Sequence, residues 1–415
     1  MVGRQTVDDH SAQGREYERS TSGGCHPERG QNDPSRSFQL CGVWSDVMKR
    51  ILHIIPSLDR AGAEKQMSLL VRGLPRDQFD VHVCVLTRAG PLRAELEESA
   101  IPVVVIGKRW RVDPQAYWRL RHEIDRRRPD LVQTWIFAAN AYGRRAALDC
   151  GVKRLVACER CVDPWKGWLE LTIDRRLARD TTRIVAVSAG VRDFYVRHGL
   201  PAEKFEVIPN GVPPAPPVST TRQEILAELG LPPESRLVAV VGRLWPQKQI
   251  KHAIWAADLL KVIRDDVHLL IIGDGPHHRR LRQFRDQVRI RDKVHFLGHR
   301  DDVPRLMPHF DVLWSTSAYE GQSNAIMEAM ACGVPVVATD IPGTRDLVIH
   351  GQTGFLVPPG VACRRELCGH TNNLLDDRPL ARRLGEAARQ RMRDHFSVER
   401  MVDRYARLYG QLLDA

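Results

Sequence analysis

The chain has 415 residues, 43% of them hydrophobic, and a formal net charge of +11 at pH 7. This length exceeds what one ordinary core accommodates, so two globular domains are expected. The longest apolar runs, at 103–106 and 269–272, are far shorter than a membrane-spanning helix requires. The polar residues at 1–40 lack an apolar segment, so no secretory signal is expected and the protein is expected to be cytoplasmic.

Cysteine usage and charge exclude further classes of protein. Nine cysteines, an odd number in a long chain, favour a reducing compartment over a disulfide scaffold. Cys158 and Cys161 form a lone C-x-x-C pair without a second pair at metal spacing, which favours incidental thiols. The basic excess indicates an anionic partner such as a nucleotide or a lipid head group. Because the basic residues are dispersed and form no nucleic-acid module, nucleic-acid binding is not expected.

The first part of the chain predicts a tail followed by an α/β domain. Residues 1–47 are rich in Arg, Ser, Gly, Asp and Gln without any period, which predicts a disordered tail without function. From Ile51 onward, strand-sized apolar runs alternate with helical patterns. This alternation is typical of a parallel sheet that binds ligands at the carboxyl ends of its strands. Strands are predicted at 51–56, 81–86, 103–106, 130–135, 154–158, 183–188 and 205–210, and helices at 64–72, 91–99 and 114–127.

The alternation restarts after PPAPPVS (213–219), which cannot form a helix or a central strand. The predicted fold class is therefore α/β, with two Rossmann-like, doubly wound parallel-sheet domains facing a central cleft. The predicted divisions are 48–212, a linker at 213–220, 221–395, and a C-terminal helix in 396–415 that packs back towards the first domain. Strands are predicted at 236–242, 268–275, 294–298, 311–316, 334–339 and 355–359, and helices at 249–263, 276–289, 301–307, 364–375 and 378–394, with another starting near Ala325. A last helix is predicted to start at Ser397, a residue suited to an N-cap, and to run to about Leu413.

The stretch YEGQSNAIMEAMACGVPVVA (319–338) predicts a ligand site. It places Glu320 and Glu328 eight positions apart, separated by a small polar loop and the start of a helix. Backbone N–H groups of 322–325 at that helix start would attract an anion. Two flanking carboxylates would accept hydrogen bonds from hydroxyls of the same ligand. The stretch therefore predicts a pocket for a ligand with both phosphates and sugar hydroxyls.

Two further motifs supply cations and glycines near strand ends. GRLWPQK (242–248) follows a strand directly, and its Arg243 and Lys248 would neutralise a diphosphate. Taken alone, both could equally be surface charges; the glutamate-containing loop favours the ligand interpretation. GDGP (273–276) and the Gly62–Glu64 helix start are weaker signals, and the latter lacks a full G-x-G-x-x-G fingerprint.

Taken in order, these motifs resemble the retaining nucleotide-sugar glycosyltransferases of family 4, which have the GT-B fold of two Rossmann domains. The specific part of the resemblance is the E-x7-E block with its flanks, and the likeness extends over roughly 50–410. The matching segments are AGAE (61–64), VIPNGV (207–212), GRL…K (242–248), GDGP (273–276), FLG (296–298), YEG…VVAT (319–339) and GQTGFLV (351–357).

The resemblance implies a role for each motif. Glu320 would contact hydroxyls of the donor sugar near the reacting carbon and is the catalytic candidate, while Glu328 would hold the ribose hydroxyls. Arg243 and Lys248 would neutralise the departing diphosphate of a UDP- or GDP-type donor, so neither a metal nor a cofactor is expected. The remaining candidate donor-binding residues, which would assist at the phosphates or lie near the base, are Gly62, Ala63, Gly275, Gln322, Ser323 and Asn324.

The family also implies transfer with retention of configuration. Same-face attack, with the leaving phosphate accepting the acceptor's proton, is the favoured route, and Glu320 as a covalent nucleophile is the alternative. A nucleotide-sugar epimerase of the same fold and a non-catalytic nucleotide-sugar-binding protein are rival functions. The first would show no dependence on an acceptor, and the second would bind the donor without turnover.

One departure from the family pattern affects the expected cleft. Many relatives carry a histidine where this sequence has Trp135, so Trp135 is a candidate cleft contact with an indole in place of an imidazole. Arg160, next to Glu159 after the following strand, is a second candidate; a structural Glu159–Arg160 ion pair is the competing interpretation.

The acceptor is expected to be a saccharide or a lipid-linked glycan, as in surface-polysaccharide or glycolipid assembly. The segment 108–128 mixes arginines with Trp110, Tyr117 and Trp118. Its ordinary interpretation is a solvated helix face with core aromatics. The alternative is a basic, aromatic surface that rests on anionic lipid at the inner face of the plasma membrane.

Overall fold

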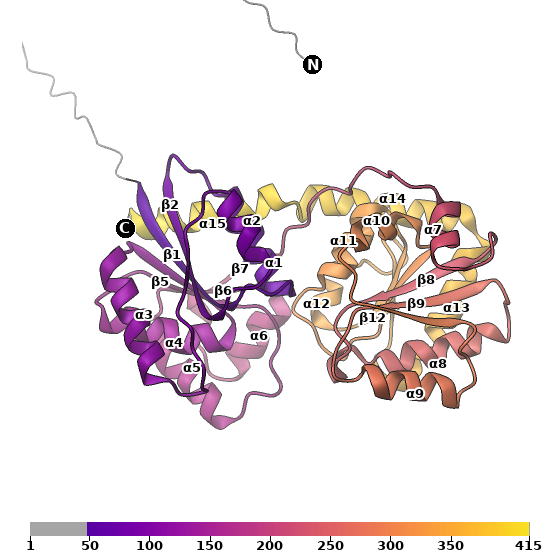
Figure 1. The fold of residues 1–415 in the computed structure, drawn as a ribbon, viewed down its shortest axis with the longest axis horizontal. Helices are drawn as coiled ribbons and strands as arrows, with labels where there is room; N and C mark the ends of the chain where they lie inside the picture. The colour runs from indigo at the N-terminus through magenta and orange to yellow at the C-terminus, as the bar shows by residue number, and fades with distance from the viewer. Residues whose placement is uncertain (1–47, 415) are drawn as a thin grey trace, which may run out of the picture. The chain divides into compact units, whose positions relative to one another are not determined.

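The computed structural model describes residues 48–414, so the predicted tail at 1–47 lies outside the described residues. The first half of the chain, 48–212, forms a sheet of seven parallel strands in the order β3-β2-β1-β4-β5-β6-β7 (Figure 1). The strands are β1 (Lys49–Ser57), β2 (Phe79–Arg88), β3 (Val103–Val105), β4 (Leu131–Trp135), β5 (Leu155–Glu159), β6 (Arg183–Ala186) and β7 (Phe205–Val207).

Helices cover both faces of this sheet, because successive buried residues of β1 point to opposite faces and both sets are apolar. Ile51 and Ile55 pack into one apolar cluster, and Leu52 and Ile54 pack into another on the opposite face. Helices α1 and α2 contribute to the first cluster, and α3 and α4 to the second. The helices of this half are α1 (Gly62–Gly73), α2 (Leu92–Glu98), α3 (Pro114–Arg127), α4 (Ile136–Asp149), α5 (Trp168–Asp180) and α6 (Ala189–Arg197).

The second half, 221–395, forms a six-stranded parallel sheet in the order β10-β9-β8-β11-β12-β13. Helices α8, α9 and α13 cover one face, while α7, α10, α11 and α14 cover the other. The strands are β8 (Arg236–Val241), β9 (Val267–Ile272), β10 (Val294–Gly298), β11 (Val312–Ser315), β12 (Val336–Thr339) and β13 (Phe355–Val357). The helices are α7 (Arg222–Glu228), α8 (Ile250–Lys261), α9 (His278–Gln287), α10 (Val303–Leu306), α11 (Asn324–Cys332), α12 (Pro342–Arg345), α13 (Cys363–Asp376) and α14 (Arg378–His395).

The C-terminal helix α15 (Val398–Leu413) joins the core of the first half. Ser397 caps it by accepting a hydrogen bond from the Arg400 backbone N–H at 3.3 Å. Tyr405 and Tyr409 are fully buried among residues of the seven-stranded sheet. The last helix of the chain therefore completes the domain that the start of the chain began.

Each sheet has a point where the strand order reverses, between β1 and β4 in the first and between β8 and β11 in the second. Loops that leave the carboxyl ends of such strand pairs form ligand crevices in doubly wound folds. The loops after β1, β8 and β11 contain the AGAE, GRLWPQK and YEGQSN motifs. The fold therefore places the predicted site motifs at the two switch points.

Candidate active site

The loop between β11 and α11 carries Glu320, which is 8% exposed. Its Oε1 accepts a hydrogen bond from Ser317 Oγ at 2.7 Å. The same oxygen forms an ion pair with Lys248 Nζ, from the 3-10 helix η2 (Pro246–Lys248) after β8. The structure brings Glu320 and Lys248 together because β8 and β11 are neighbouring strands.

Gln247 holds the other side of the Glu320 loop. Its Nε2 donates a hydrogen bond to the Tyr319 carbonyl at 2.8 Å and lies 3.4 Å from Glu320 Oε2. Its backbone carbonyl accepts a hydrogen bond from the Ala318 N–H at 2.8 Å. Sequence reasoning missed Gln247 because it is uncharged, although it lies within the GRLWPQK motif.

The Glu320 loop also packs tightly against the loop that follows β5. A Cβ on Gly321 would lie 1.9 Å from the Arg160 carbonyl oxygen, so only glycine permits this approach. The next residue, Cys161, has its Sγ 3.8 Å from Gln247 Nε2. Burial raises the pKa of the Cys161 thiol, and the charge of Glu320 acts in the same direction. The loop after β5 therefore lies beside the Glu320 loop, as does Val187 after β6.

Arg243 is the exposed cation of the site. It follows β8, and its guanidinium lies 5.6 Å from the Trp245 ring centroid. It forms no ion pair with any residue in 48–414. Burial raises the pKa of Glu64 in α1, while the charge of Arg243 acts in the opposite direction. The charge of Arg243 thus acts on Glu64 at the start of α1, and with no ion-pair partner among residues 48–414 the guanidinium is available to an anion.

The start of α1 meets the start of α11. Asn324 Nδ2 donates a hydrogen bond to the Gly62 carbonyl at 3.3 Å, and Gln66 Nε2 donates to Asn324 Oδ1 at 3.3 Å. One turn further along each helix, Lys65 Nζ pairs with Glu328 Oε1. Glu328 therefore lies at the contact between the two helix starts, one from each half of the chain.

Backbone N–H groups at both helix starts have no acceptor within 48–414. These groups belong to the predicted donor-binding residues Gly62, Ala63, Gln322, Ser323 and Asn324. The Gln322 side chain binds the first half of the chain, because its Oε1 accepts a hydrogen bond from the Asn210 N–H at 2.9 Å. Two uncapped helix starts and two cations make this region suited to an anionic ligand.

Gly275 lies where the loops after β8 and β9 pack closely at the carboxyl edge of the second sheet. A Cβ on Gly275 would lie 2.8 Å from the Leu244 carbonyl oxygen. The Leu244 N–H donates a hydrogen bond to the Asp274 carbonyl at 2.9 Å, which holds the same two loops together. The contact of Gly275 with a nucleotide base stays a prediction.

The structure corrects the predicted cleft contact of Trp135. The indole is fully buried in the core of the first half, and its Nε1 donates a hydrogen bond to His53 Nδ1 at 3.1 Å. Burial lowers the pKa of His53 to about 3, which keeps this ring neutral and able to accept that bond. Trp135 points inward because α15 covers this face of β4, and Tyr405 of α15 lies 6.3 Å from it between ring centroids.

Arg160 also differs from its prediction, because only its backbone reaches the Glu320 loop. Its guanidinium is bonded to Asn210 Oδ1, lies 3.5 Å from the Tyr405 hydroxyl and sits 5.2 Å from the Trp135 ring centroid. The side chain is 9% exposed and braces the first half against α15. It does not pair with Glu159, so the alternative Glu159–Arg160 ion pair is absent as well.

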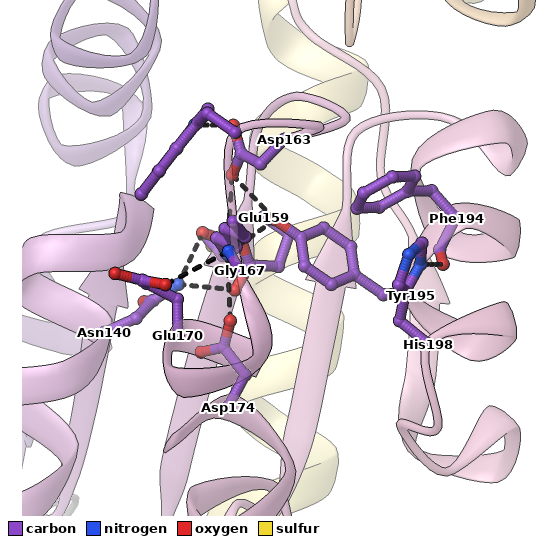
Figure 2. Close-up of polar contacts among 12 residues, drawn as sticks. Asn140, Glu159, Asp163, Gly167, Glu170, Asp174, Phe194, Tyr195 and His198 are labelled. Carbon is purple, nitrogen blue, oxygen red and sulfur yellow. Dashed lines mark hydrogen bonds and ion pairs between the residues drawn. The ribbon is translucent and has the colours of Figure 1, made fainter. Parts of the chain in front are cut away.

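Glu159 instead belongs to a buried ionic cluster beneath the loop after β5 (Figure 2). At its centre, Lys166 Nζ is fully buried and lies 2.7 Å from the Tyr195 hydroxyl and 2.9 Å from Asp174 Oδ2. Asp163 and Glu159 carboxylate oxygens lie 3.4 and 3.5 Å from the same nitrogen. The cluster therefore ties the loop after β5 to α5 and α6.

Two residues of α4 complete the cluster. Arg144 Nη2 pairs with Asp174 Oδ1 at 2.9 Å, and Asn140 Nδ2 donates a hydrogen bond to Glu159 Oε1 at 2.8 Å. Glu159 and Asp174 are buried and the Asp163 side chain is 19% exposed, so three carboxylates share two cations, and one negative charge lacks a matching cation when all are ionised.

Glu159→Gln is expected to change how the free energy of unfolding depends on pH. Burial raises the pKa of Glu159 from 4.5 to about 7, although the Lys166 charge opposes this. Between pH 4.5 and about pH 7, Glu159 keeps its proton in the folded chain but has lost it in the unfolded chain. The stability contributed by this carboxyl therefore declines as pH rises. The free energy of unfolding should be measured with urea for both proteins at about pH 5 and about pH 8. The value for the variant should rise relative to that of the wild type at the higher pH. A difference that does not change with pH would contradict the expectation.

Hollows in the surface of 48–414 do not identify the Glu320 loop. One of about 490 Å³ is lined by Ile124, Arg128 and Cys150, before the amino ends of β4 and β5. The hollow beside Lys248 and Ser317 holds only about 10 Å³. No group of three or more His, Cys, Asp or Glu side chains in these residues is arranged to hold a metal ion. The site is therefore defined by its polar groups.

Two family profiles match the chain in tandem. Residues 60–215 match the profile described as Glycosyltransferase Family 4, and residues 221–391 match Glycosyl transferases group 1. The chain belongs to glycosyltransferase family 4. This glycosyltransferase has the GT-B fold, and the family expected from the E-x7-E block and its flanks is confirmed, as is the fold class.

Curated relatives of this glycosyltransferase include several sugar transferases. The galactosyltransferase of Escherichia coli named UDP-Gal:alpha-D-GlcNAc-diphosphoundecaprenol alpha-1,3-galactosyltransferase is 27% identical over 363 residues, covering 81% of this chain and 90% of the relative. Alpha-maltose-1-phosphate synthase of Mycobacterium tuberculosis is 30% identical over 60% of this chain and 70% of its own length. The chain spans about half, 49%, of N-acetyl-alpha-D-glucosaminyl L-malate synthase of Bacillus anthracis, at 29% identity over 46% of this chain.

Solved structures agree on the fold. Anabaena HepE, crystallised in complex with UDP and glucose, superposes with a TM-score of 0.77 at 25% identity, covering 88% of this chain and 100% of its own. Sucrose-phosphate synthase from Thermosynechococcus elongatus gives a TM-score of 0.70 at 20% identity, covering 88% and 99%.

Proposed function

We propose that this glycosyltransferase moves a sugar, with retention of configuration and without a metal ion, from a nucleotide-diphosphate sugar to a saccharide or lipid-linked acceptor. The observation that carries the proposal is the meeting of Arg243, Lys248 and Glu320 with two helix starts whose N–H groups lack acceptors. HepE, named as a complex with UDP and glucose, supports a UDP-type donor. The site is expected to act in the cytoplasm.

The cations and N–H groups would act on the leaving group. Breaking the bond between sugar and phosphate develops negative charge on the diphosphate, and preorganised donors lower that barrier most effectively. Arg243 has no ion-pair partner among residues 48–414, whereas Lys248 already shares its charge with Glu320. Arg243 and the two helix starts would therefore supply most of the stabilisation that a metal ion provides elsewhere.

Glu320 is suited to orienting the donor sugar. Lys248 and Ser317 bind one of its carboxylate oxygens, and Gln247 lies beside the other. A carboxylate held in this way is a weak nucleophile but a well-positioned acceptor for sugar hydroxyls. This arrangement favours same-face attack over a covalent intermediate on Glu320.

Glu328→Ala is expected to weaken binding of UDP by about ten- to a hundred-fold, because hydrogen bonds to a charged acceptor contribute about 1.5–3 kcal/mol. A thermal-shift panel of UDP, GDP and their sugars measures this, since a ligand that binds the folded chain raises its stability. Lys65→Met is the matched control: it breaks the same ion pair but keeps the carboxylate. Wild type and this control should both shift with one nucleotide.

Other outcomes of the panel and of a turnover assay would assign a rival function. Absence of a shift with every nucleotide would overturn the donor site. Binding without turnover in any acceptor mixture would indicate a nucleotide-sugar-binding protein. Conversion of the donor sugar without an acceptor would indicate an epimerase.

A further inference from the structure

Exposed tryptophans are concentrated in the first half of the chain. Five tryptophans within 48–414 are strongly exposed, and all except Trp245 lie between 105 and 169. Three of them lie on two loops, 108–112 after β3 and 164–169 at the start of α5, together with Val112 and Leu169. Their exposed fractions are 70% for Trp110, 78% for Val112, 56% for Trp165, 77% for Trp168 and 49% for Leu169.

These two loops, called here the two-loop surface, are joined although they are far apart in the sequence. Arg111 Nη2 pairs with Glu170 Oε1 at 2.9 Å, and the Gly167 N–H donates a hydrogen bond to Glu170 Oε2 at 3.1 Å. The hydroxyl of Tyr142 in α4 donates to the Arg111 carbonyl at 3.1 Å. Figure 2 shows Gly167 and Glu170 together at the start of α5, beside the buried cluster. The exposed side chains of both loops therefore belong to one surface.

The base of this surface is rigid. Trp165 Nε1 donates a hydrogen bond to Asp163 Oδ1 at 3.0 Å, and its ring packs edge-on against Phe137 with centroids 5.6 Å apart. Directly after it, Lys166 is the buried centre of the ionic cluster. An apolar surface that is built this firmly and still exposed indicates a partner.

The charge of the surface identifies the chemistry of that partner. Lys108, Arg109 and Arg111 lie among the tryptophans, with Glu170 as the acidic side chain that pairs there, and Arg109 has no ion pair within 48–414. Tryptophan combined with Lys and Arg is favoured at the interface of a bilayer, where the cations are attracted to anionic head groups. Among residues 48–414 the structure contains no helix with the length and hydrophobicity of a membrane span.

We propose that the two-loop surface docks on an anionic lipid bilayer. Cys161, three residues before this loop begins, lies 3.8 Å from Gln247 of the Glu320 site, so the docked bilayer would border the acceptor side of that site. The proposal deepens the proposed function, because it holds that the acceptor is lipid-linked. The relative named for a diphosphoundecaprenol acceptor is consistent with it. The two-loop surface shares Trp110 with the basic, aromatic segment 108–128 but does not include Tyr117, whose ring packs on Tyr142.

The test is co-sedimentation of the full chain with phosphatidylcholine vesicles, prepared with and without phosphatidylglycerol. The wild type should bind the anionic vesicles, less so at high salt, and the Trp168→Ser/Leu169→Ser variant should lose at least about tenfold in binding. Val262→Ser/Ile263→Ser is the matched control, because these side chains at the end of α8 are 86% and 59% exposed. The control should bind as the wild type does.

Several results would overturn the proposal: no binding of the wild type to anionic vesicles, equal binding to both vesicle types, or equal losses in variant and control. A mass in solution that halves in the variant would indicate a second copy of the chain as the partner. If the variant unfolds early, Arg109→Gln/Trp110→Ser tests the other loop. The shift with UDP should persist in all of these variants, so failure here leaves the donor site intact.

Discussion

Arg243→Met is expected to lower kcat/KM by about a hundred- to a thousand-fold, because removing one preorganised donor from a developing charge costs about 2.7–4 kcal/mol. Arg243 is the more available of the two cations for the diphosphate, since it is exposed and has no ion-pair partner in the described part of the chain, while Lys248 is held by Glu320. For the same reason, the free energy of unfolding should remain within about 0.5 kcal/mol of the wild-type value.

The measurement is initial-rate kinetics with the nucleotide sugar identified by the thermal-shift panel. Arg282→Met is the matched control, because Arg282 is an exposed arginine on α9, outside the loops of the site. Arg243→Lys should recover part of the lost activity, because Lys keeps the positive charge but lacks the planar guanidinium that binds two phosphate oxygens at once. Equal losses in Arg243→Met and Arg282→Met would show that general surface charge, and not this position, matters.

Lys166→Met is expected to destabilise the first half by about 3–5 kcal/mol, because removing one partner of a buried ionic group leaves carboxylates without compensation. Lys166 Nζ is the cation that lies within 3.5 Å of Glu159, Asp163 and Asp174. The loss should appear as a lower urea midpoint of unfolding, followed by tryptophan fluorescence.

A second variant keeps this expectation testable. Lys166→Met combined with Asp174→Asn removes one buried negative charge along with the cation, so it should be less unstable than the sum of its single variants. Lys65→Met is the comparison, since its ion pair with Glu328 is partly exposed and should contribute about 1 kcal/mol or less. A loss of that small size in Lys166→Met would show that water reaches the cluster.

Most of the architecture was predictable because it follows local pattern. The alternation of apolar runs with helical segments placed strands and helices close to their observed positions, and Ser397 was recognisable as a helix cap. Helices α4, α5, α6, α7 and α12 were not assigned individually. The last predicted strand of the first half, 205–210, is shorter in the structure, at Phe205–Val207.

Side-chain direction at strand ends was less predictable. Trp135 lies at the end of β4 and Arg160 directly after β5, near the predicted strand ends, but both side chains point inward towards α15. That helix is about 270 positions further along the chain than Trp135, and no local pattern reveals which face it covers. Gln247 and the Glu159 cluster were missed for a related reason, because their roles depend on neighbours that only packing supplies.

By itself, the sequence determined the fold class, the family and the residue types of the donor site, because short-range patterns of burial, charge and glycine encode them. Only the tertiary structure decided which of those residues meet, since strand order brings β8 beside β11 and the helix starts of α1 and α11 together. It also decided that two distant loops of the first half form one tryptophan surface, because the Arg111–Glu170 ion pair joins segments that are far apart in the sequence.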